Sequence, residues 1–195
     1  MRTRRFALAA IGTVVLACSR PLAAQGTESA HPLEIDAVVG HVTADGKDFG
    51  STKGATAVGG ALRYVFLRHL GLGLGVHYSD HGLTSLPEHL HIRVLYAEGR
   101  YSAPLGSSAI TLFGGPRGGW AHEDITSVTW TANGSVIGAV AGLDWRFASQ
   151  LALELQLSES VIHLGDLKGA DGSVLSGSAV HGTSFGVEAG LVVRF

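Results

Sequence analysis

Apolar and polar residues alternate with a period of two along most of the chain after residue 32. The alternation is clearest at the C-terminus, where single residues separate Phe185, Val187, Ala189, Leu191, Val193 and Phe195. A period of two places successive side chains on opposite faces of a β-strand, and a helical period of 3.6 residues is hard to find. Eight segments of this kind are predicted, at residues 33–43, 54–67, 70–80, 89–103, 107–121, 134–147, 150–164 and 178–195. The sequence therefore predicts an all-β chain of eight strands.

Long and short connections alternate between these segments. The short ones are centred on residues 68–69, 105–106 and 148–149, and the long ones span 44–50, 80–88, 123–134 and 165–177. An even number of strands with short turns at one end and longer loops at the other is typical of antiparallel up-and-down barrels that cross a membrane. The long connections are polar and glycine-rich, and Trp130 is the one aromatic residue in them that we expect to anchor a partner.

A soluble β-sandwich or lipocalin-like barrel also alternates, with its apolar face turned inward. Two features favour the membrane barrel. The polar face carries glycines and single charges in place of the lysines of a solvent-exposed surface. Aromatic residues also lie at strand ends on the apolar face, as in the interfacial belt of membrane barrels. The predicted girdle consists of Tyr64, Phe66, Tyr101, Trp120, Trp145 and Phe147.

Composition supports the same interpretation. Charged residues make up 15% of the chain, against about 25% in typical soluble proteins. Glycine is abundant, with 28 residues in 195, and on strands such as 70–80 it occupies the polar face, where small residues suit a narrow barrel interior. A single cysteine excludes a disulfide within the chain.

The N-terminus has the pattern of a secretory signal peptide. A basic start (Arg2, Arg4 and Arg5) precedes the apolar run 6–17, and small residues lead to Ala24. We expect cleavage after residue 24, a periplasmic segment at 25–32 and a barrel domain at 33–195. Residues 15–18 also form a loose lipobox, which would instead leave a lipidated Cys18. Removing residues 1–24 takes away four arginines, so 14 − 4 = 10 basic residues remain against 16 acidic ones, a net charge of −6. Nothing in this charge balance indicates a nucleic-acid partner.

The signal peptide, the eight alternating segments and the final run from Val187 to Phe195 together carry a resemblance to a known family. The chain resembles the small OmpA/OmpX-like eight-stranded outer-membrane β-barrels of Gram-negative bacteria. The resemblance implies periplasmic termini, four extracellular loops, contact with outer-membrane lipids and lipopolysaccharide, a monomeric state, and no cofactor or catalytic residue. It also implies that Leu191, Val193 and Phe195 form the signal by which the barrel-assembly machinery recognises the chain.

The charged residues of the polar face are expected to point into the barrel. An eight-stranded barrel is only wide enough for its own side chains, and buried charges are tolerated only in pairs. Closure of the barrel would place Glu34 and Asp36 close to Arg194. We therefore predict a plugged lumen held by an ion-pair network, the alternative being a narrow ion path. The network comprises the acids Glu34, Asp36, Glu98, Asp144, Glu154 and Glu188 and the bases Arg63, Arg100, Arg117, Arg146 and Arg194.

Two strands depart from the simple pattern. Pro116 falls inside the fifth segment, although a closed barrel has no free edge to accept a proline; a glycine-flanked bulge or a late start of pairing would accommodate it. In the fourth segment both faces are apolar, with Ile92 and Val94 on one and Leu95 and Ala97 on the other.

Eight of the ten histidines lie at the long-loop ends of strands, and four of them share the apolar face: His41, His122, His163 and His181. Three interpretations are open: metal binding, contact with lipopolysaccharide phosphates, and replacement of tyrosine or tryptophan in the interfacial belt. No tight ligand spacing supports a metal, and outward-facing residues on different strands are expected to diverge. We therefore favour the belt and predict no metal site.

One catalytic alternative comes from residues 77–80. His77, Ser79 and Asp80 offer the residue types of a hydrolytic triad, as in outer-membrane lipid A deacylases. His77 and Ser79 share the lumen-facing side of their strand, where an acyl chain in the membrane would not reach them. The favoured interpretation is a non-enzymatic barrel that serves membrane integrity or surface interaction through short extracellular loops.

Overall fold

The computed structural model describes residues 32–45, 54–67, 69–82, 89–106, 109–125 and 129–195. The predicted signal peptide (1–24), Cys18 and nearly all of the segment 25–32 lie outside the described residues. Within these ranges, no helical segment has the length and hydropathy needed to cross a membrane.

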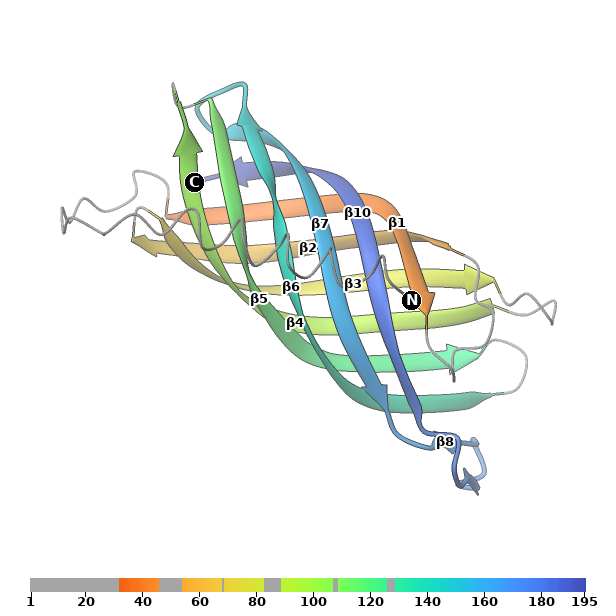
Figure 1. The fold of residues 1–195 in the computed structure, drawn as a ribbon. Coiled ribbons are helices and arrows are strands. Elements are labelled where there is room, and N and C mark those ends of the chain that lie inside the picture. Colours follow the sequence, from red (N-terminus) through yellow and green to blue (C-terminus); the bar gives the residue numbers. More distant parts are fainter. Residues whose placement is uncertain (1–31, 46–53, 68, 83–88, 107–108, 126–128) are drawn as a thin grey trace, which may run out of the picture.

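Eight long antiparallel strands form one closed sheet (Figure 1). Each strand pairs with its neighbours in sequence, and pairing of β1 with β10 and of β5 with β6 completes the ring. The predicted eight-stranded antiparallel barrel is thus confirmed. The strands are β1 (Leu33–Asp45), β2 (Ala55–Leu67), β3 (Leu70–Gly82), β4 (His89–Leu105), β5 (Ile110–Ile125), β6 (Trp130–Arg146), β7 (Leu151–Leu164) and β10 (Val180–Arg194).

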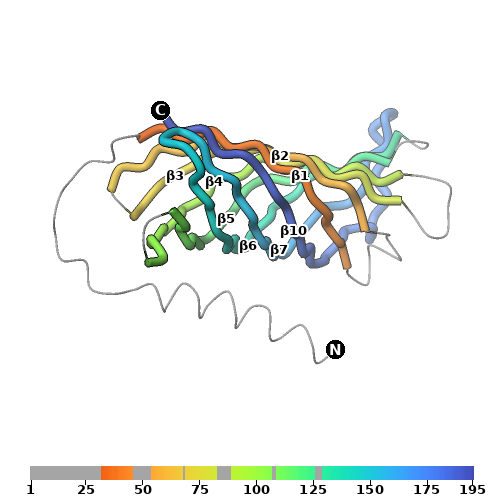
Figure 2. The backbone as a smooth tube through the Cα atoms, turned by 90° about the horizontal axis from the view of Figure 1, so that it is seen from above, coloured from red at the N-terminus to blue at the C-terminus, as the bar shows by residue number. Residues whose placement is uncertain are grey.

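The two ends of the barrel differ. At one end, which we call the turn end, lie the connections 68–69, 106–109 and 147–150, with Gly106 supplying a positive φ of 62° in one tight turn. The start of β1 and the C-terminus meet there, where the Phe195 amide donates to the Leu33 carbonyl at 2.8 Å. The opposite end, the loop end, carries the connections 46–54, 83–88, 126–129 and 165–179. Strands on opposite walls of the barrel cross at an angle (Figure 2), as expected for a tilted, twisted sheet.

Burial alternates along most of each strand, except near residues 113–115 of β5 and 140–141 of β6, and the alternating buried positions point into the barrel. In β1, for example, Asp36, Val38 and Val42 are buried whereas Ile35 and Val39 are exposed. The two-sided fourth segment follows the same rule, because Ile92, Tyr96, Glu98 and Arg100 are buried and Leu95 and Ala97 are exposed. The apolar face predicted from the C-terminal strands is therefore the outer wall.

The third long connection is shorter than predicted. β5 continues to Ile125 and β6 begins at Trp130, so the two residues are register partners and only 126–129 connects the strands. Trp130 is partly buried in the sheet and is not the exposed loop anchor that the sequence predicted.

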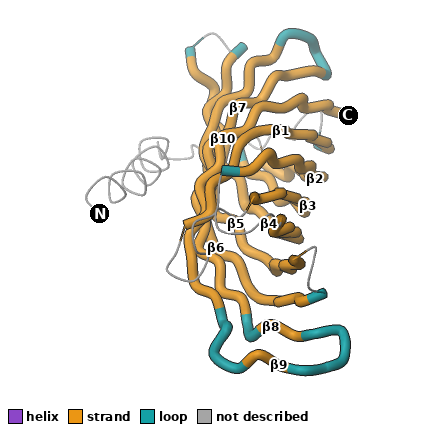
Figure 3. The backbone as a smooth tube through the Cα atoms, turned by 90° about the vertical axis from the view of Figure 1, so that its right-hand side faces the viewer, coloured by secondary structure: helices purple, strands orange, loops and turns teal. Residues whose placement is uncertain are grey.

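The fourth long connection contains a small hairpin, β8 (Leu167–Lys168) and β9 (Val174–Leu175), which the sequence did not predict. It projects beyond the barrel (Figure 3), and Lys168 pairs with Thr131 of β6. Asp166 accepts hydrogen bonds from the amides of Gly177 and Ala179 at 3.1 and 3.0 Å. In the hairpin, hydrogen bonds from the hydroxyl and amide of Ser173 lower the pKa of the Asp171 carboxyl below its usual value.

Pro116 lies within β5 without a bulge. The β4–β5 register is the same on both sides of it, from Glu98 opposite Arg117 to Tyr101 opposite Gly114, but the ladder is interrupted between these pairs. On the other side, Pro116 remains opposite Ala139 of β6. A proline has no N–H to donate, and a short gap in one ladder accommodates it here.

Candidate functional site

Arg63 is the centre of a charged cluster in the turn-end half of the barrel interior. It lies on β2 with its side chain 2% exposed. Its guanidinium contacts three carboxylates: Glu34 at 3.0 Å and Asp36 at 2.7 Å on the neighbouring strand β1, and Glu98 at 3.4 Å on β4. Arg63 therefore joins strands on both sides of β2 through the interior.

Glu98 is the second centre, because three arginines contact its two oxygens. Oε1 accepts from Arg63 and from Nε of Arg100 at 2.8 Å, and Oε2 accepts from Nη2 of Arg117 at 2.7 Å. Arg100 also reaches Glu154 on β7 at 2.7 Å. Since β4 and β7 are on different walls of the barrel, this pair spans the interior.

Closure of the barrel adds a third group of contacts. Arg194 on β10 donates to Glu34 on β1 at 2.8 Å and to Asp144 on β6 at 2.9 Å. Asp144 and Glu154 are opposite each other on β6 and β7. Within the described residues, one oxygen of each of these two carboxylates and Nε of Arg63 have no hydrogen-bond partner.

His77 connects the cluster to the last predicted acid. Its Nε2 lies 2.6 Å from Oε1 of Glu188, and Gln156 donates to Oε2 of the same carboxylate at 2.7 Å. Gln156 lies 3.5 Å from Arg117, which links this group to Glu98. The alternation of residues predicts that His77 faces the lumen, but neither His77 nor Gln156 is among the predicted network residues.

The structure thus brings ten of the eleven predicted network residues into contacts inside the barrel. The eleventh, Arg146, is exposed at the turn end. It is the last residue of β6, where the inward-facing side of the strand opens to solvent at the turn end.

Aromatic rings and glycines complete the environment of the arginines. The guanidinium of Arg100 lies 3.7 Å from the ring centre of Phe113, and that of Arg117 lies 4.1 Å from that of Tyr96, both within cation–π range. Inward-facing glycines of β3 leave the space these side chains need. A Cβ at Gly71 would lie 3.1 Å from Cδ of Arg63, and one at Gly75 would collide with the Tyr96 ring.

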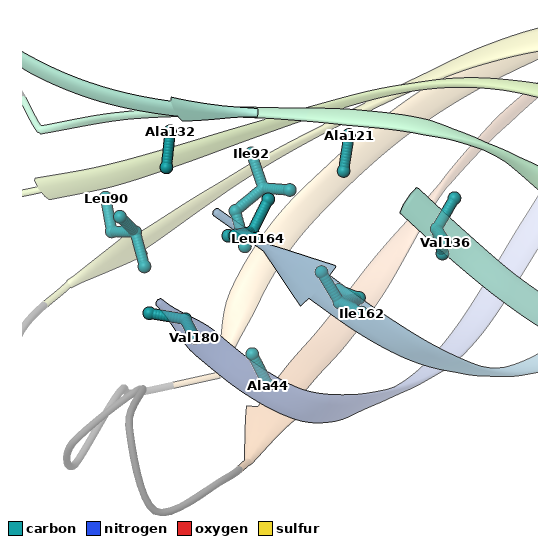
Figure 4. Packing of buried hydrophobic residues seen from close by; sticks show 9 residues of the cluster. All are labelled: Ala44, Leu90, Ile92, Ala121, Ala132, Val136, Ile162, Leu164 and Val180. Carbon is teal, nitrogen blue, oxygen red and sulfur yellow. The ribbon is translucent and has the colours of Figure 1, made fainter. Parts of the chain in front are cut away.

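The loop-end half of the interior contains an apolar cluster, which the assignment of one polarity to each face does not predict, beside the buried polar residues Ser79, His81 and Glu123. Side chains from six strands meet there, all pointing inward (Figure 4). Val94, Ile125 and Leu167 pack against them. The interior therefore has a charged layer at the turn end and a mainly apolar layer at the loop end. The residues of the apolar layer are Ala44, Leu90, Ile92, Ala121, Ala132, Val136, Ile162, Leu164 and Val180.

The outer wall has the opposite polarity. Large apolar side chains are exposed around the barrel, among them Leu72, Leu74, Val76 and Ile137 at 60–70% exposure. A groove of about 790 Å³ runs over the outer wall from β1 to β6, and the small or short side chains of Gly99, Pro116 and Gly118 form part of its floor. A water-soluble protein of this size rarely exposes so continuous an apolar surface.

Most of the predicted girdle residues lie on this outer wall. Tyr64, Phe66, Trp145 and Phe147 are exposed at the turn end, as is the C-terminal Phe195. Tyr101 is partly buried, with its ring centre 5.8 Å from that of His69. Trp120 is exposed toward the loop end, where it stacks on His122.

Comparison with known proteins gives a fold. No protein-family model and no curated protein sequence matches the chain. The structure is similar to that of neisserial surface protein A, with a TM-score of 0.69 and 15% identity over 86% of this chain and 100% of that one. It is also similar to outer membrane protein OprG of Pseudomonas aeruginosa (TM-score 0.53, 16% identity, 86% of this chain and 97% of that one). A third similar structure is that of outer membrane protein AlkL in lipid bilayers (TM-score 0.56, 10% identity, 91% of this chain and 96% of that one). The chain has the fold of the small outer-membrane β-barrels.

At the loop end of this outer-membrane barrel fold, the outward-facing histidines have different surroundings. His122 contacts Asn133 at 2.7 Å, and Asp80 lies 2.7 Å from His89 and 3.6 Å from His91. The prediction that outward-facing histidines on different strands diverge is wrong for His163 and His181. They are register partners on β7 and β10, with ring centres 4.9 Å apart, so these two side chains do not diverge.

The three residues of the hydrolase alternative are not assembled as a triad. His77 contacts Glu188 inside the barrel, whereas Oγ of Ser79 lies 3.0 Å from Nε2 of His81, also inside. Asp80 is on the other face of β3, with His89. Within the described part of the chain, no group of three histidine, cysteine, aspartate or glutamate residues has the arrangement of a metal site.

Proposed function

We propose that this protein is an integral outer-membrane barrel with a closed lumen, serving membrane integrity or surface interaction. One observation carries the proposal: the polarity of the closed sheet is inverted relative to a soluble barrel. Leu74 and Ile137 face outward and are exposed, while Arg63 and Glu98 face inward and are buried. In water this arrangement would expose the apolar wall, but in a bilayer it buries that wall in lipid and leaves the backbone hydrogen bonds satisfied by closure.

The orientation follows from the family resemblance. We infer that the turn end, with the start of β1 and the C-terminal Phe195, is periplasmic and that the loop end is extracellular, as the length of the connections supports. Leu191, Val193 and Phe195 lie on the outward side of β10 and at its end, and we infer that the barrel-assembly machinery recognises them there. Surface interaction would then involve the connections 46–54, 83–88 and 126–129 and the β8–β9 hairpin, and lipopolysaccharide would contact the loop-end rim of a monomer.

A closed lumen is supported by the two layers of the interior. Ions entering from the loop end would meet the packed apolar side chains around Ile92 and Ile162, which hydrated ions do not pass readily. Beyond it, Arg63 and Arg100 are already paired with carboxylates on other strands. Both features argue against the narrow ion path as well as against an open pore.

A first prediction tests the membrane barrel directly. The full chain, folded into detergent or phospholipid vesicles, is expected to migrate faster on an unheated denaturing gel than after boiling, because a closed barrel resists unfolding by the gel detergent. The measurement compares the two mobilities for the same sample. A soluble sandwich would show one mobility, and that result would contradict the proposal.

A second prediction tests the lumen. Purified monomer inserted into planar bilayers at 1 M KCl is expected to give no stable single-channel conductance, because the apolar layer excludes hydrated ions. Insertion is verified independently by protease protection in vesicles made from the same preparation. A large, stable conductance from verified monomer would overturn the closed lumen while leaving the membrane barrel intact.

No activity is assigned to the residues of the hydrolase alternative. A hydrolytic serine needs a histidine base within hydrogen-bond reach and an acid to orient that base. Ser79 and His81 are close but lie inside the barrel, and Asp80 faces the other way. Their positions support the non-enzymatic function.

A further inference from the structure

We propose that His163 and His181 form a binding site for one divalent transition-metal ion, of the class Cu²⁺, Ni²⁺ or Zn²⁺, on the outer rim of the loop end. The two residues are directly opposite each other on β7 and β10. Both side chains point outward and are exposed, and their ring centres are 4.9 Å apart at an interplanar angle of 72°.

The register makes this spacing a property of the backbone. Directly opposed residues of an antiparallel pair have Cβ atoms about 4.5–5.5 Å apart. A ladder of consecutive pairs holds β7 against β10 from Val180–Leu164 to Val193–Leu151, and β6 pairs with the other edge of β7. The two imidazoles are therefore held near each other before any ion binds.

The chemistry of the pair selects the class of ion. Imidazole nitrogens bind Cu²⁺, Ni²⁺ and Zn²⁺ at about 2.0–2.1 Å for zinc, whereas Mg²⁺ and Ca²⁺ prefer oxygen ligands. Rotation of two exposed rings can bring one nitrogen of each to a common ion. With two imidazole ligands, water would occupy the remaining coordination positions of the ion. Because both ligands are neutral, they would not compensate the charge of the ion.

No other described histidine shares this arrangement. His41 is opposite Val187 and Thr56, and His122 is opposite Arg93 and Asn133. His91 is opposite Asp80 and Asp124, and its Nδ1 lies 2.7 Å from the Tyr78 hydroxyl. Among the histidines in the described ranges, His163 and His181 alone are partners of each other. His122 is thus a natural control, since it is on the same face and rim but has no histidine opposite.

The test measures metal binding to the full chain folded in detergent without a polyhistidine tag. Calorimetric titrations at pH 7.5 use CuCl₂, NiCl₂, ZnCl₂ and MgCl₂ separately, on the wild type and on His163→Ala, His181→Ala and His122→Ala. We expect one Cu²⁺ per chain, the tightest binding for Cu²⁺, and no heat with Mg²⁺. Either alanine substitution in the pair should weaken Cu²⁺ binding at least tenfold, and His122→Ala should leave it unchanged.

A second readout distinguishes ligation from a structural effect of the substitutions. The electron paramagnetic resonance spectrum of bound Cu²⁺ should show two equivalent nitrogens in the wild type and one in either variant. If an alanine variant does not fold, the phenylalanine substitution at the same position keeps the ring volume and replaces it.

Three results would overturn the site. One is an absence of Cu²⁺ uptake by folded wild type, and another is uptake that neither substitution weakens. The third is equal weakening by His122→Ala, which would assign the ion to scattered rim histidines. None of these results bears on the barrel or its closed lumen.

Discussion

Replacing Arg63 with methionine is expected to lower the free energy of unfolding by about 3–5 kcal/mol, the usual cost of removing one partner from a buried ion pair. Arg63 contacts Glu34, Asp36 and Glu98 and is almost fully buried. Methionine has similar length but no charge, so it would leave up to three carboxylates without this counter-charge. The change is measured as a shift of the urea midpoint at constant slope, using tryptophan fluorescence of protein folded in detergent.

Arg93 provides the matched control. Its side chain is 60% exposed, and it pairs with Asp124 at 3.3 Å on the outer face. Arg93→Met should therefore cost only about 0–1 kcal/mol, as for other exposed pairs. An Arg63→Met variant as stable as Arg93→Met would show that the charged layer does not stabilise the barrel.

Asp36 allows the interaction itself to be separated from the loss of a side chain. In the interior it accepts a hydrogen bond from Arg63 at 2.7 Å. In the Arg63→Met background, Asp36→Asn removes a charge that has lost its partner, and it should recover part of the stability. In the wild type the same substitution should be destabilising. A double-mutant cycle whose coupling free energy is zero would contradict a direct pair.

The alternation of residues was sufficient to predict which side chains enter the barrel. The side of the sheet on which a side chain lies is a local property, because successive Cβ atoms of a strand point to opposite sides. For this reason Glu98 and Arg100 could be placed inside even though both faces of their strand are apolar. The partner of a charge is not a local property. Arg100 with Glu154 and His77 with Glu188 join strands that are not neighbours, and such contacts depend on the tilt and cross-section of the closed barrel.

The apolar layer could not be predicted by assigning one polarity to each face. Ile92 and Val136 are inward-facing and apolar, as are Leu90 and Ile162. An eight-stranded barrel is narrow enough for such side chains to meet across it, so its interior does not have to be polar over its full length. Apolar residues on both faces of the fourth segment were the signal in the sequence.

The third connection was predicted too long for a related reason. The polar residues Asp124 and Asn133 indicated a loop, but they belong to strands that continue at the loop end of the sheet. We infer that this part of the barrel extends above the bilayer, where the outer face meets water and polar residues are tolerated in strands. The same extension brings His163 and His181 together, because the strands stay paired up to that level.

Replacing Leu74 with arginine is expected to destabilise the protein in phospholipid vesicles by about 2–4 kcal/mol, as for arginine on the lipid-facing wall near the bilayer midplane. Leu74 is in the turn-end half of β3, faces outward and is 66% exposed. If the wall faced water, an exposed arginine would change the stability by no more than about 0.5 kcal/mol, because it would break no contact of the interior. The two environments therefore predict clearly different outcomes. The measurement is the urea unfolding curve of the variant and the wild type in vesicles of the same lipid.

Leu105→Arg is the control, since it makes the same chemical change at the end of a strand. Leu105 is the last residue of β4, at the turn end, and is 56% exposed. There the arginine would reach the aqueous interface, and the expected cost falls to about 0–1 kcal/mol. Because both variants replace leucine with arginine, the difference between their unfolding free energies reports the depth of each position in the bilayer. An equal loss of unfolding free energy at the two positions would contradict a membrane-spanning wall. Only in a bilayer does the destabilisation by one charge depend on its position along the barrel axis.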